Sequence, residues 1–438
     1  MRKTAKLGWL FALLCAALLL GGCAPNPSDK SLYCLPKLPT EYESLKTLID
    51  QLVADGAEYA APTSGSNLQS VQMVDLDGDG EEEAVAIFRR AGDERPMKIY
   101  VFRTVNDSYE QFSVIEGTSN SIYSISYVDL DGDGWREILA GIRSDLDVQN
   151  LSVWSVAKGN AKQLLLTGYS RYAARDLDGD GQLDLIVLHS DEENSVIADY
   201  YVWDATEMAL CSSLRLPSTI AELNRVTAGT LMGGEAALFV TAVAEDSAVT
   251  DILTVCDGVL HNVRSGATGE VFRFLDLYPN DVNGDDVTEV PEPVPFVRTG
   301  TDETVYYRIR WRQYDTDGQS VVVRETFQDS QSGWSLQLPE GWDKDVIVNR
   351  SVSADGTAVT FSRSTWEEQD YEPFLTVYAF TGYNRTALAS RGGRIMLSRQ
   401  AEVTYAAELY DEGAGMIDEQ TLRDSFSLVS AEWTTGEN

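Results

Sequence analysis

Histidine and positive charge are scarce in this sequence. Only two histidines, His189 and His261, occur among 438 residues, and 34 Lys and Arg stand against 69 Asp and Glu, a formal charge of −35. So few histidines leave almost no material for a zinc site or a Ser-His-Asp triad. The acidic balance also argues against nucleic acid as a partner and against direct binding to an anionic membrane surface, because both need a basic face.

Cysteine is rare as well, with five residues in the whole chain. After Cys23 there remain Cys34, Cys211 and Cys256. An odd number of widely spaced cysteines does not make a disulfide framework. Cys211 and Cys256 could still pair with each other, but two ordinary buried thiols are the favoured interpretation.

The first 22 residues have the features of a targeting segment and not of a folded domain. Arg2, Lys3 and Lys6 precede an apolar run over 7–20, which ends in Leu-Gly-Gly-Cys at 20–23. Small residues before a cysteine at this place resemble the bacterial lipoprotein signal. The resemblance implies cleavage before Cys23, acylation of Cys23 and a lipid anchor that holds the protein outside the cytoplasm on the bacterial membrane. The alternative is an ordinary signal peptide with a chance cysteine.

Residues 23–67 are predicted to form a tether followed by one helix. Prolines are frequent from 25 to 39, as expected of an extended spacer. Beyond them, five apolar residues fall on one helical face: Leu45, Leu48, Ile49, Leu52 and Val53. We expect this helix to pack on the element that follows.

An acidic, glycine-rich motif occurs four times in the middle of the chain. The copies span 74–83, 128–137, 175–184 and 280–289, with first acids at Asp75, Asp129, Asp176 and Asp281. The last interval is about twice the others, so one unit without an acidic loop should lie between the third and fourth copies. Residues 227–240 are the candidate, because they keep the glycines and the apolar strand but lack the carboxylates.

Each acidic loop leads into a continuous apolar run, such as 84–88 or 138–142, which suits a strand buried on both faces. A period near 50 residues with about four strands per unit is typical of propeller blades. We therefore predict a mainly β fold, with a β-propeller of about five blades over 68–329. An open, solenoid-like array is the alternative.

The spacing of the acids predicts a site for a hard cation. In the first copy Asp75, Asp77 and Asp79 occupy positions 1, 3 and 5, and Glu83 occupies position 9. With a backbone carbonyl at position 7 they offer about six oxygen ligands, which suits Ca²⁺ better than Mg²⁺. Position 7 holds a different residue type in every copy, as carbonyl ligation allows: Glu81, Trp135, Gln182 and Val287.

An EF-hand and a solvated acidic turn are two other interpretations of the loops. An EF-hand needs a glutamate at position 12, but that position holds Ala86, Ala140 or Val187 inside a predicted strand, which also excludes a dockerin-like site. A solvated acidic turn without an ion remains possible. It is most plausible in the fourth copy, where Asn283 replaces an acid and Asp286 replaces a glycine.

The motif resembles the FG-GAP/VCBS repeat, the calcium-binding blade of integrin α-subunit propellers and of many bacterial surface proteins. The resemblance implies three calcium sites and a possible fourth. The side-chain ligands it implies are Asp75, Asp77, Asp79 and Glu83; Asp129, Asp131, Asp133 and Glu137; Asp176, Asp178, Asp180 and Asp184; and Asp281, Asn283, Asp285 and Glu289. The Phe-Gly and Gly-Ala-Pro signature that gives the family its name is not evident.

Residues 330–438 are predicted to form a small α+β domain. Six strand candidates lie between 335 and 408, and a helix is expected from Asp418, as N-cap, to about Phe426. The Leu-Pro-Glu-Gly-Trp segment at 338–342 weakly resembles the entry of PsbP-like domains, which are mostly binding or assembly modules. Gly392 and Gly393 indicate a turn and not a phosphate loop.

These features predict a lipid-anchored, calcium-binding module for a protein or glycan ligand. The alternative is a glycoside-cleaving or polysaccharide-cleaving enzyme, which would need two facing acids outside the calcium loops. Acids such as Glu292, Glu367 and Glu368 show no such pattern. Trp154, Trp203 and Trp311 could stack on sugars, although core packing is the favoured interpretation.

Overall fold

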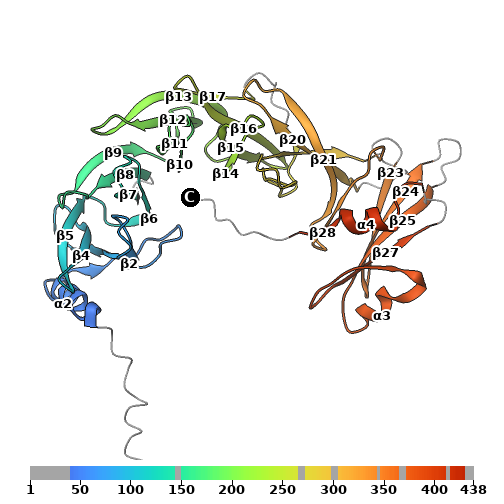
Figure 1. Cartoon of the computed structure of the whole chain (residues 1–438), viewed down its shortest axis with the longest axis horizontal. Helices are drawn as coiled ribbons and strands as arrows, with labels where there is room; N and C mark the ends of the chain where they lie inside the picture. Colours follow the sequence, from blue (N-terminus) through green and yellow to red (C-terminus); the bar gives the residue numbers. More distant parts are fainter. Residues whose placement is uncertain are drawn as a thin grey trace, which may run out of the picture.

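The computed structural model describes residues 40–143, 149–264, 272–296, 304–342, 346–364, 371–410 and 415–429. The predicted signal peptide (1–22), the lipidation site at Cys23 and the tether up to residue 39 lie outside these ranges. The described part consists of six antiparallel sheets with three short α-helices (Figure 1). The predicted mainly β fold is confirmed.

The first four sheets follow one another along the chain. The first contains β1 (Glu58–Tyr59), β2 (Val71–Val74), β3 (Glu83–Arg89), β4 (Met97–Val105) and β5 (Ser108–Gly117). The second contains β6 (Ile122–Val128), β7 (Glu137–Arg143), β8 (Gln149–Ser155) and β9 (Lys162–Gly168). The third contains β10 (Arg171–Arg175), β11 (Asp184–Ser190), β12 (Ser195–Trp203) and β13 (Met208–Thr219). The fourth contains β14 (Leu223–Thr230), β15 (Ala236–Ala244), β16 (Ser247–Cys256), β17 (Val259–Asn262) and β18 (Phe272–Arg273).

The last two sheets involve the C-terminal part of the chain. The fifth contains β19 (Val290–Pro295), β20 (Tyr307–Tyr314), β21 (Ser320–Asp329), β22 (Trp334–Gln337) and β28 (Phe426–Leu428). The sixth contains β23 (Val346–Ser353), β24 (Gly356–Ser364), β25 (Tyr371–Phe380), β26 (Ile395–Arg399) and β27 (Thr404–Leu409). The helices are α2 (Thr40–Ala54), α3 (Arg385–Ala389) and α4 (Glu419–Ser425), and η2 (Arg391–Gly393) is a 3₁₀ turn.

The first four sheets have the connectivity of propeller blades. Each of them contains four strands that pair antiparallel in chain order, and β1 and β18 add to two of these sheets by pairing with β3 and β16. Figure 1 shows β2, β6, β10 and β14 on the inner side of an arc, and β5, β9, β13 and β17 on its outer side. The fourth sheet is the unit predicted without carboxylates, since β14 and β15 enclose its glycine turn.

The strands next to the acidic loops are buried because both of their faces are covered. On β3, Val85 and Ile87 pack toward the second sheet, while Ala84, Ala86 and Phe88 point to the opposite face. All five are fully inaccessible to solvent. A strand buried on both faces has no polar alternation, which explains the continuous apolar runs in the sequence.

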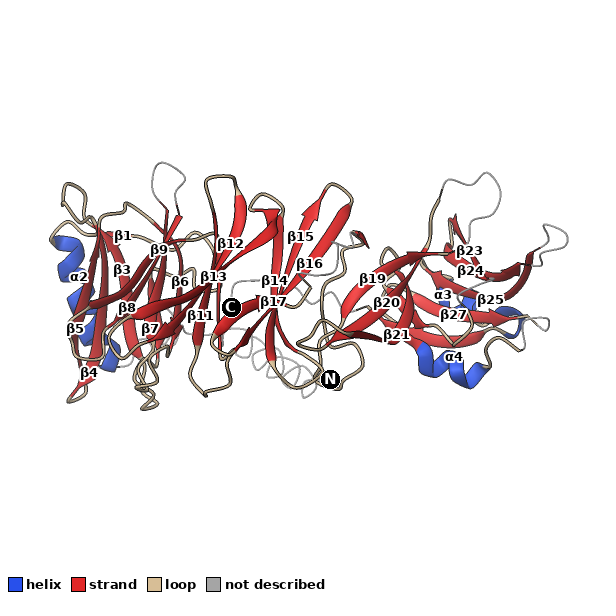
Figure 2. Cartoon of the chain, turned by 90° about the horizontal axis from the view of Figure 1, so that it is seen from above, coloured by secondary structure: helices blue, strands red, loops and turns tan. Residues whose placement is uncertain are grey.

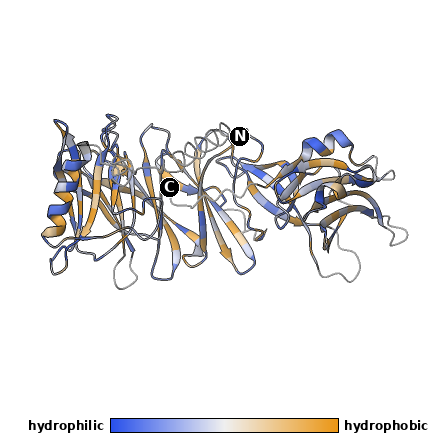
Figure 3. Cartoon of the chain, turned by 90° about the horizontal axis from the view of Figure 1, so that it is seen from below, coloured by the Kyte–Doolittle hydropathy of each residue, from blue (hydrophilic) through white to orange (hydrophobic). Residues whose placement is uncertain are grey.

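Helix α2 covers the free face of the first sheet. Its buried residues Leu45 and Ile49 join a cluster with Phe88, Tyr100 and Phe102. Figure 3 shows that the helix has a hydrophilic and a hydrophobic side. The predicted helix and its packing are confirmed, except that Val53 is 42% exposed, because it lies at the edge of the apolar stripe. No helix of the described residues has the length and apolarity to cross a bilayer.

Each core cluster in the described part of the chain joins neighbouring elements. Separate clusters link the first sheet to the second, the second to the third, the third to the fourth and the fourth to the fifth. None of these clusters joins the first sheet to the fifth. Figure 2 shows the sheets side by side along the long axis, with α2 at one end and α4 near the other.

The fifth sheet also belongs to the core of the C-terminal region. Its residues Phe327, Trp334 and Leu336 pack with Phe361 and Val377 of the sixth sheet in one large cluster. Strand β22 pairs with β21 on one side and with β28 on the other, so this sheet runs across residue 330. Each of the predicted C-terminal strands corresponds to one of β22 to β27. Asp418 caps α4 by accepting a hydrogen bond from Thr421 N at 2.7 Å.

Candidate metal centres

Three of the four acidic loops connect a pair of antiparallel strands: β2 and β3, β6 and β7, and β10 and β11. The fourth loop lies directly before β19. Position 9 opens the second strand and pairs with the residue before position 1: Glu83 with Val74, Glu137 with Val128, and Asp184 with Arg175. Before the fifth sheet, Glu289 and Asn280 form an isolated bridge in the same way. Each loop is therefore the turn of a β-hairpin that is closed by its last acid.

One hydrogen-bond pattern recurs in all four loops. In the first, Asp75 Oδ1 accepts from Gly78 N at 2.7 Å, and Asp75 Oδ2 accepts from Gly80 N at 3.2 Å. Glu83 Oε2 accepts from Leu76 N at 2.8 Å. The corresponding bonds from position 2 to position 9 measure 2.9, 2.8 and 2.8 Å in the other three loops. Backbone amides thus fix the orientation of the first and last acids.

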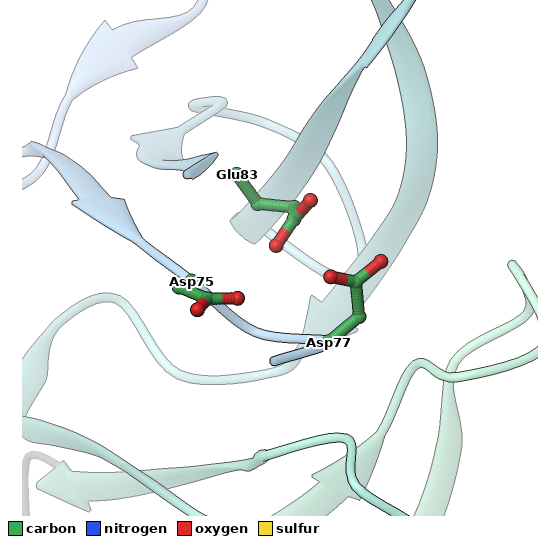
Figure 4. Close-up of side chains that lie close together, drawn as sticks. All are labelled: Asp75, Asp77 and Glu83. Atoms are coloured by element: carbon green, nitrogen blue, oxygen red, sulfur yellow. The ribbon is translucent and has the colours of Figure 1, made fainter. Parts of the chain in front are cut away.

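These bonds bring carboxylates from distant positions together. Asp75, Asp77 and Glu83 offer oxygen atoms that lie within 4.8 Å of one another, and Figure 4 shows the three side chains converging. Three further groups meet the same criterion: Asp129, Asp131 and Glu137; Asp176, Asp178 and Asp184; and Asp281, Asp285 and Glu289. Each group could hold a metal ion through oxygen ligands.

The acids at position 5 of the first three loops lie outside these groups. Asp79, Asp133 and Asp180 instead accept hydrogen bonds from the position-7 amides at 2.7 to 2.8 Å. The side chains at position 7 have other surroundings: Trp135 stacks on Phe112, and Gln182 donates to Leu130 O at 3.2 Å. The position-7 side chains are thus free to vary, while their backbone stays in the same turn.

The fourth loop keeps the turn despite its two substitutions. Asp286 adopts a φ of 66° at the position that is glycine elsewhere, a conformation that Asp tolerates better than most residues. Its amide still donates to Asp281 Oδ2 at 3.0 Å. Asn283 donates to Asp285 Oδ2 at 3.0 Å, so an internal amide contact takes the place of one acid.

The last acid of each loop is deeply buried. Glu83, Glu137, Asp184 and Glu289 are at most 4% exposed. Burial raises the pKa of all four carboxyls, and the neighbouring loop acids add to the effect. The pKa of Glu137 rises to about 7 and that of Asp184 to about 6. Burial therefore disfavours the charged form of these groups more than their hydrogen bonds favour it.

The first acid of the fourth loop behaves differently. Burial acts to raise the pKa of Asp281, but four backbone amides donate to its carboxylate and the net effect lowers the pKa. The pKa of Asp285 is also lowered, chiefly by a hydrogen bond from Gln313. Part of the charge in this loop is thus stabilised by the protein itself.

The loops differ in how the second oxygen of the last acid is satisfied. Asp184 Oδ1 accepts from Tyr200 Oη at 3.2 Å, and Glu289 Oε1 accepts from Gln313 Nε2 at 2.7 Å. Glu137 Oε1 is buried and forms no hydrogen bond of normal geometry among the described residues, and the nearby Ser155 hydroxyl lowers the pKa of this carboxyl by less than burial raises it. A buried carboxylate oxygen without a donor fits a site whose missing partner is a cation.

Tyr200 contacts the third loop and Gln313 contacts the fourth, and neither contact was predicted from the sequence. Tyr200 lies on β12 and also donates to Asp178 Oδ2 at 3.3 Å, while Gln313 lies on β20 and also donates to Asp285 Oδ2 at 2.8 Å. Both come from the strand that pairs with the one following the loop, 16 and 24 residues after the acid they contact. The motif contains no signal for them, because it ends at position 9.

Adjacent loops contact each other through backbone carbonyls. Arg136 N, in the second loop, donates to Leu76 O of the first loop at 2.7 Å. Gln182 of the third loop reaches Leu130 O of the second. The first three loops therefore form a continuous edge on one side of the blade array.

Other residues singled out in the sequence are engaged elsewhere. Glu292 forms ion pairs with Arg310 and Arg312, and Glu367 and Glu368 lie outside the described residues. Trp311 is buried, as predicted, and Trp154 and Trp203 are half-buried against blade cores. Cys211 and Cys256 are free thiols. The prediction that both are buried is wrong for Cys211, which is exposed on the outer strand β13, and Cys256 is only half-buried.

Comparison with known structures gives weak overall similarities. A rhamnogalacturonan lyase, YesX, aligns with 11% identity and a TM-score of 0.31, over 73% of this chain and 78% of its own. The periplasmic gluconolactonase PpgL of Pseudomonas aeruginosa aligns with 11% identity and a TM-score of 0.30, over 71% and 86%. These values carry no argument about activity. No curated protein matches the sequence.

The family comparison agrees with the loop geometry. The model of the FG-GAP-like repeat matches residues 75–140, which run from the first acid of loop one through the second loop and into β7. This interval contains two of the four acidic groups and the backbone contact between them. The chain thus carries an FG-GAP-like repeat, set in a propeller-type series of antiparallel sheets.

Proposed function

We propose that this protein is a calcium-binding lipoprotein that stands on the outer side of a bacterial cell membrane and binds a protein or glycan partner. The observation that supports calcium most strongly is the convergence of three carboxylates at each of four hairpin turns. Oxygen-only ligands select a hard cation, and the number of anionic oxygens favours Ca²⁺ over Mg²⁺.

Electrostatic repulsion makes the cation important for the fold. Two carboxylates about 4 Å apart repel each other by roughly 4 kcal/mol at an effective dielectric constant near 20. In loop two this repulsion acts on Glu137, which is fully buried. A bound cation relieves the repulsion and also supplies the missing partner of Glu137 Oε1. The loops with Tyr200 and Gln313 depend less on the ion.

The binding role is supported by position and sequence context. The lipobox-like segment ending at Cys23 would place the blades outside the cytoplasm, and the acidic surface does not suit a nucleic acid. We assign no catalytic residues. A glycosidase would need a pair of unengaged acids outside the loops, whereas Glu292 is held by two arginines.

Calcium binding can be tested by titration calorimetry and thermal unfolding. We expect Ca²⁺ to raise the melting temperature strongly, since a ligand at 100 times its Kd stabilises a site by about 2.7 kcal/mol. The double variant Asp129→Asn/Asp176→Asn should bind fewer ions and gain less stability. Glu110→Gln, which changes an exposed acid of β5 outside the loops, is the matched control.

Two results would refute the calcium proposal. One is an identical melting curve in chelator and in Ca²⁺, and the other is unchanged ion stoichiometry in the double variant. The partner is then sought by pull-down from envelope extract with and without Ca²⁺, using the double variant as the reference for calcium-dependent capture.

A further inference from the structure

The outer face of the sixth sheet is polar and carries a hollow. One face of this sheet packs on the fifth sheet through Val359, Phe361 and Val377. The alternate residues point the other way, and among them Ser351, Ala358 and Tyr378 lie in one cross-strand row. At the end of this face, α3 packs on Phe380 and Ala406. The angle between the sheet face and the segment α3–η2 forms a cavity of about 400 Å³ that is open to solvent.

Two aromatic rings and the arginine that lies over them form one wall of this cavity. Tyr378 and Phe380 are stacked, with centroids 5.2 Å apart and an interplanar angle of 7°. The Arg394 guanidinium lies over Tyr378 at 4.2 Å and over Phe380 at 5.3 Å. Glu408 and Leu388 O fix this guanidinium at 3.4 and 2.9 Å. The guanidinium is therefore held in place by the chain itself.

Two charged side chains that line the cavity have no such engagement. Arg391 lies in η2, and Asp355 lies in the turn between β23 and β24. Neither side chain forms a hydrogen bond or an ion pair with the described part of the chain. Ser351 and Ser353 add hydroxyl groups to the same lining. The cavity thus offers a free cationic donor, a free anionic acceptor and several hydroxyls.

This combination selects a particular ligand chemistry. A carboxylate on the ligand would satisfy Arg391 by a charge-assisted hydrogen bond. A simple anion would be repelled by Asp355 and Glu408, whereas a ligand that also carries hydroxyl groups can donate to them. Because Arg394 covers both rings, recognition of the ligand falls to the charged and hydroxyl groups of the lining. The volume falls within the usual range for small-molecule sites.

We propose that this cavity, lined by Ser351, Asp355, Tyr378, Arg391 and Arg394, binds a sugar acid. The choice of ligand class rests on the binding role proposed above, but the site is separate from the metal loops and does not need Ca²⁺. It would give the C-terminal region its own ligand, a small polyhydroxylated carboxylate or the acidic end of a glycan.

The test is ligand-observed NMR with the full chain, using D-glucuronate as the probe. We expect saturation transfer to glucuronate, with affinity at least tenfold greater than for glucose, which lacks the carboxylate, and for acetate, which lacks the hydroxyls. Arg391→Gln should weaken glucuronate binding at least tenfold. Arg399→Gln is the matched control, because it removes the same charge from an exposed position at the end of β26 that does not line the cavity.

A second variant separates hydroxyl recognition from charge. Asp355→Asn should weaken glucuronate binding but not acetate binding. Free monosaccharide and a glucuronate-ended oligosaccharide, titrated in parallel, distinguish the two sources of the ligand. The proposal is overturned by absent saturation transfer, by equal affinity for acetate or inorganic phosphate, or by equal losses in Arg391→Gln and Arg399→Gln. Running each titration in chelator and in Ca²⁺ keeps the result independent of the metal loops.

Discussion

At the scale of the residue, the four buried acids at position 9 determine how the loops behave. Each closes its hairpin and accepts a backbone hydrogen bond, which a neutral carboxyl or amide oxygen could also do. Their negative charge is therefore not needed for the turn. It is needed only if a cation binds there, and in the cation-free protein the charge is a cost.

Glu137 allows this cost to be measured by a pH series. Its folded pKa of about 7 lies above the ordinary value of 4.5, so its contribution to stability is fully present below pH 4.5 and is lost as the pH rises through 7. In chelator, Glu137→Gln should therefore be more stable than the parent at pH 8, by about 2–3 kcal/mol, and not at pH 4.

Urea unfolding at pH 4 and pH 8 checks this expectation. The matched control is Glu81→Gln in the first loop, which removes an exposed acid whose side chain lies outside the converging carboxylates. In saturating Ca²⁺ the sign should reverse, because the variant loses a metal ligand. An equal stability difference at both pH values in chelator would contradict the explanation.

At the scale of the element, α2 covers the free face of the first sheet. Ile49 is 7% exposed and packs with Phe88 and Tyr100. Truncation of a buried Ile to Ala costs 2–5 kcal/mol through lost burial and the cavity left behind. We expect Ile49→Ala to lower the free energy of unfolding by an amount in this range, measured by urea titration.

The control for this prediction is Gln51→Ala, on the exposed side of the same helix. It should change stability by less than about 0.5 kcal/mol. A contrary result would be that Ile49→Ala hardly changes the free energy of unfolding while α2 becomes sensitive to proteolysis. The helix would then be docked too weakly to stabilise the array, and its assignment as a cap would be wrong.

Sequence alone predicted the repeated elements well, for an identifiable reason. The loop acids from Asp75 to Glu83 lie close in the chain, and strands buried on both faces leave long apolar runs, so both signals are local. Tyr200 and Gln313 were missed because they reach the loops from another strand. The sugar-acid cavity was missed for the same reason, since Tyr378, Arg391 and Ser351 meet only through sheet pairing and the packing of α3.

The sequence predicted the centre of the buried face of α2 correctly, but not its edge. The period of α2 correctly indicated Leu45 and Ile49, but it also included Val53, which the structure leaves exposed. Similarly, the sequence predicted a boundary near residue 330, but the fifth sheet continues past it because β22 pairs with β21. Local sequence patterns do not reveal this pairing.

At the scale of the whole molecule, net charge acts on all the sheets together. The formal charge of −35 includes the acids of the four loops. Within each loop, the converging carboxylate oxygens lie within 4.8 Å of one another. Raising the ionic strength from 0.01 to 0.1 M shortens the Debye length from about 30 to about 10 Å. Repulsion between separate loops should therefore weaken in salt.

We expect sodium chloride over this range to stabilise the calcium-free protein by about 1 kcal/mol, which corresponds to a rise of about 1 °C in melting temperature for a chain of this length. The same series in saturating Ca²⁺ should show a smaller rise, because the ions have already reduced the charge. Scanning calorimetry measures both series. Equal rises with and without Ca²⁺ would show that the loops are not the source of the repulsion.

The pairing of β22 with β28 has a consequence for how the protein is made. Residues 334–337 are synthesised about 90 positions before their partner at 426–428, so the fifth sheet cannot gain its outermost strand until the end of the chain has left the ribosome. The four earlier sheets consist of consecutive strands and can form while synthesis continues. A nascent chain stalled after residue 330 would therefore already hold its acidic turns, while the edge of β21 waits uncovered for β22, whose own outer edge waits for the final segment.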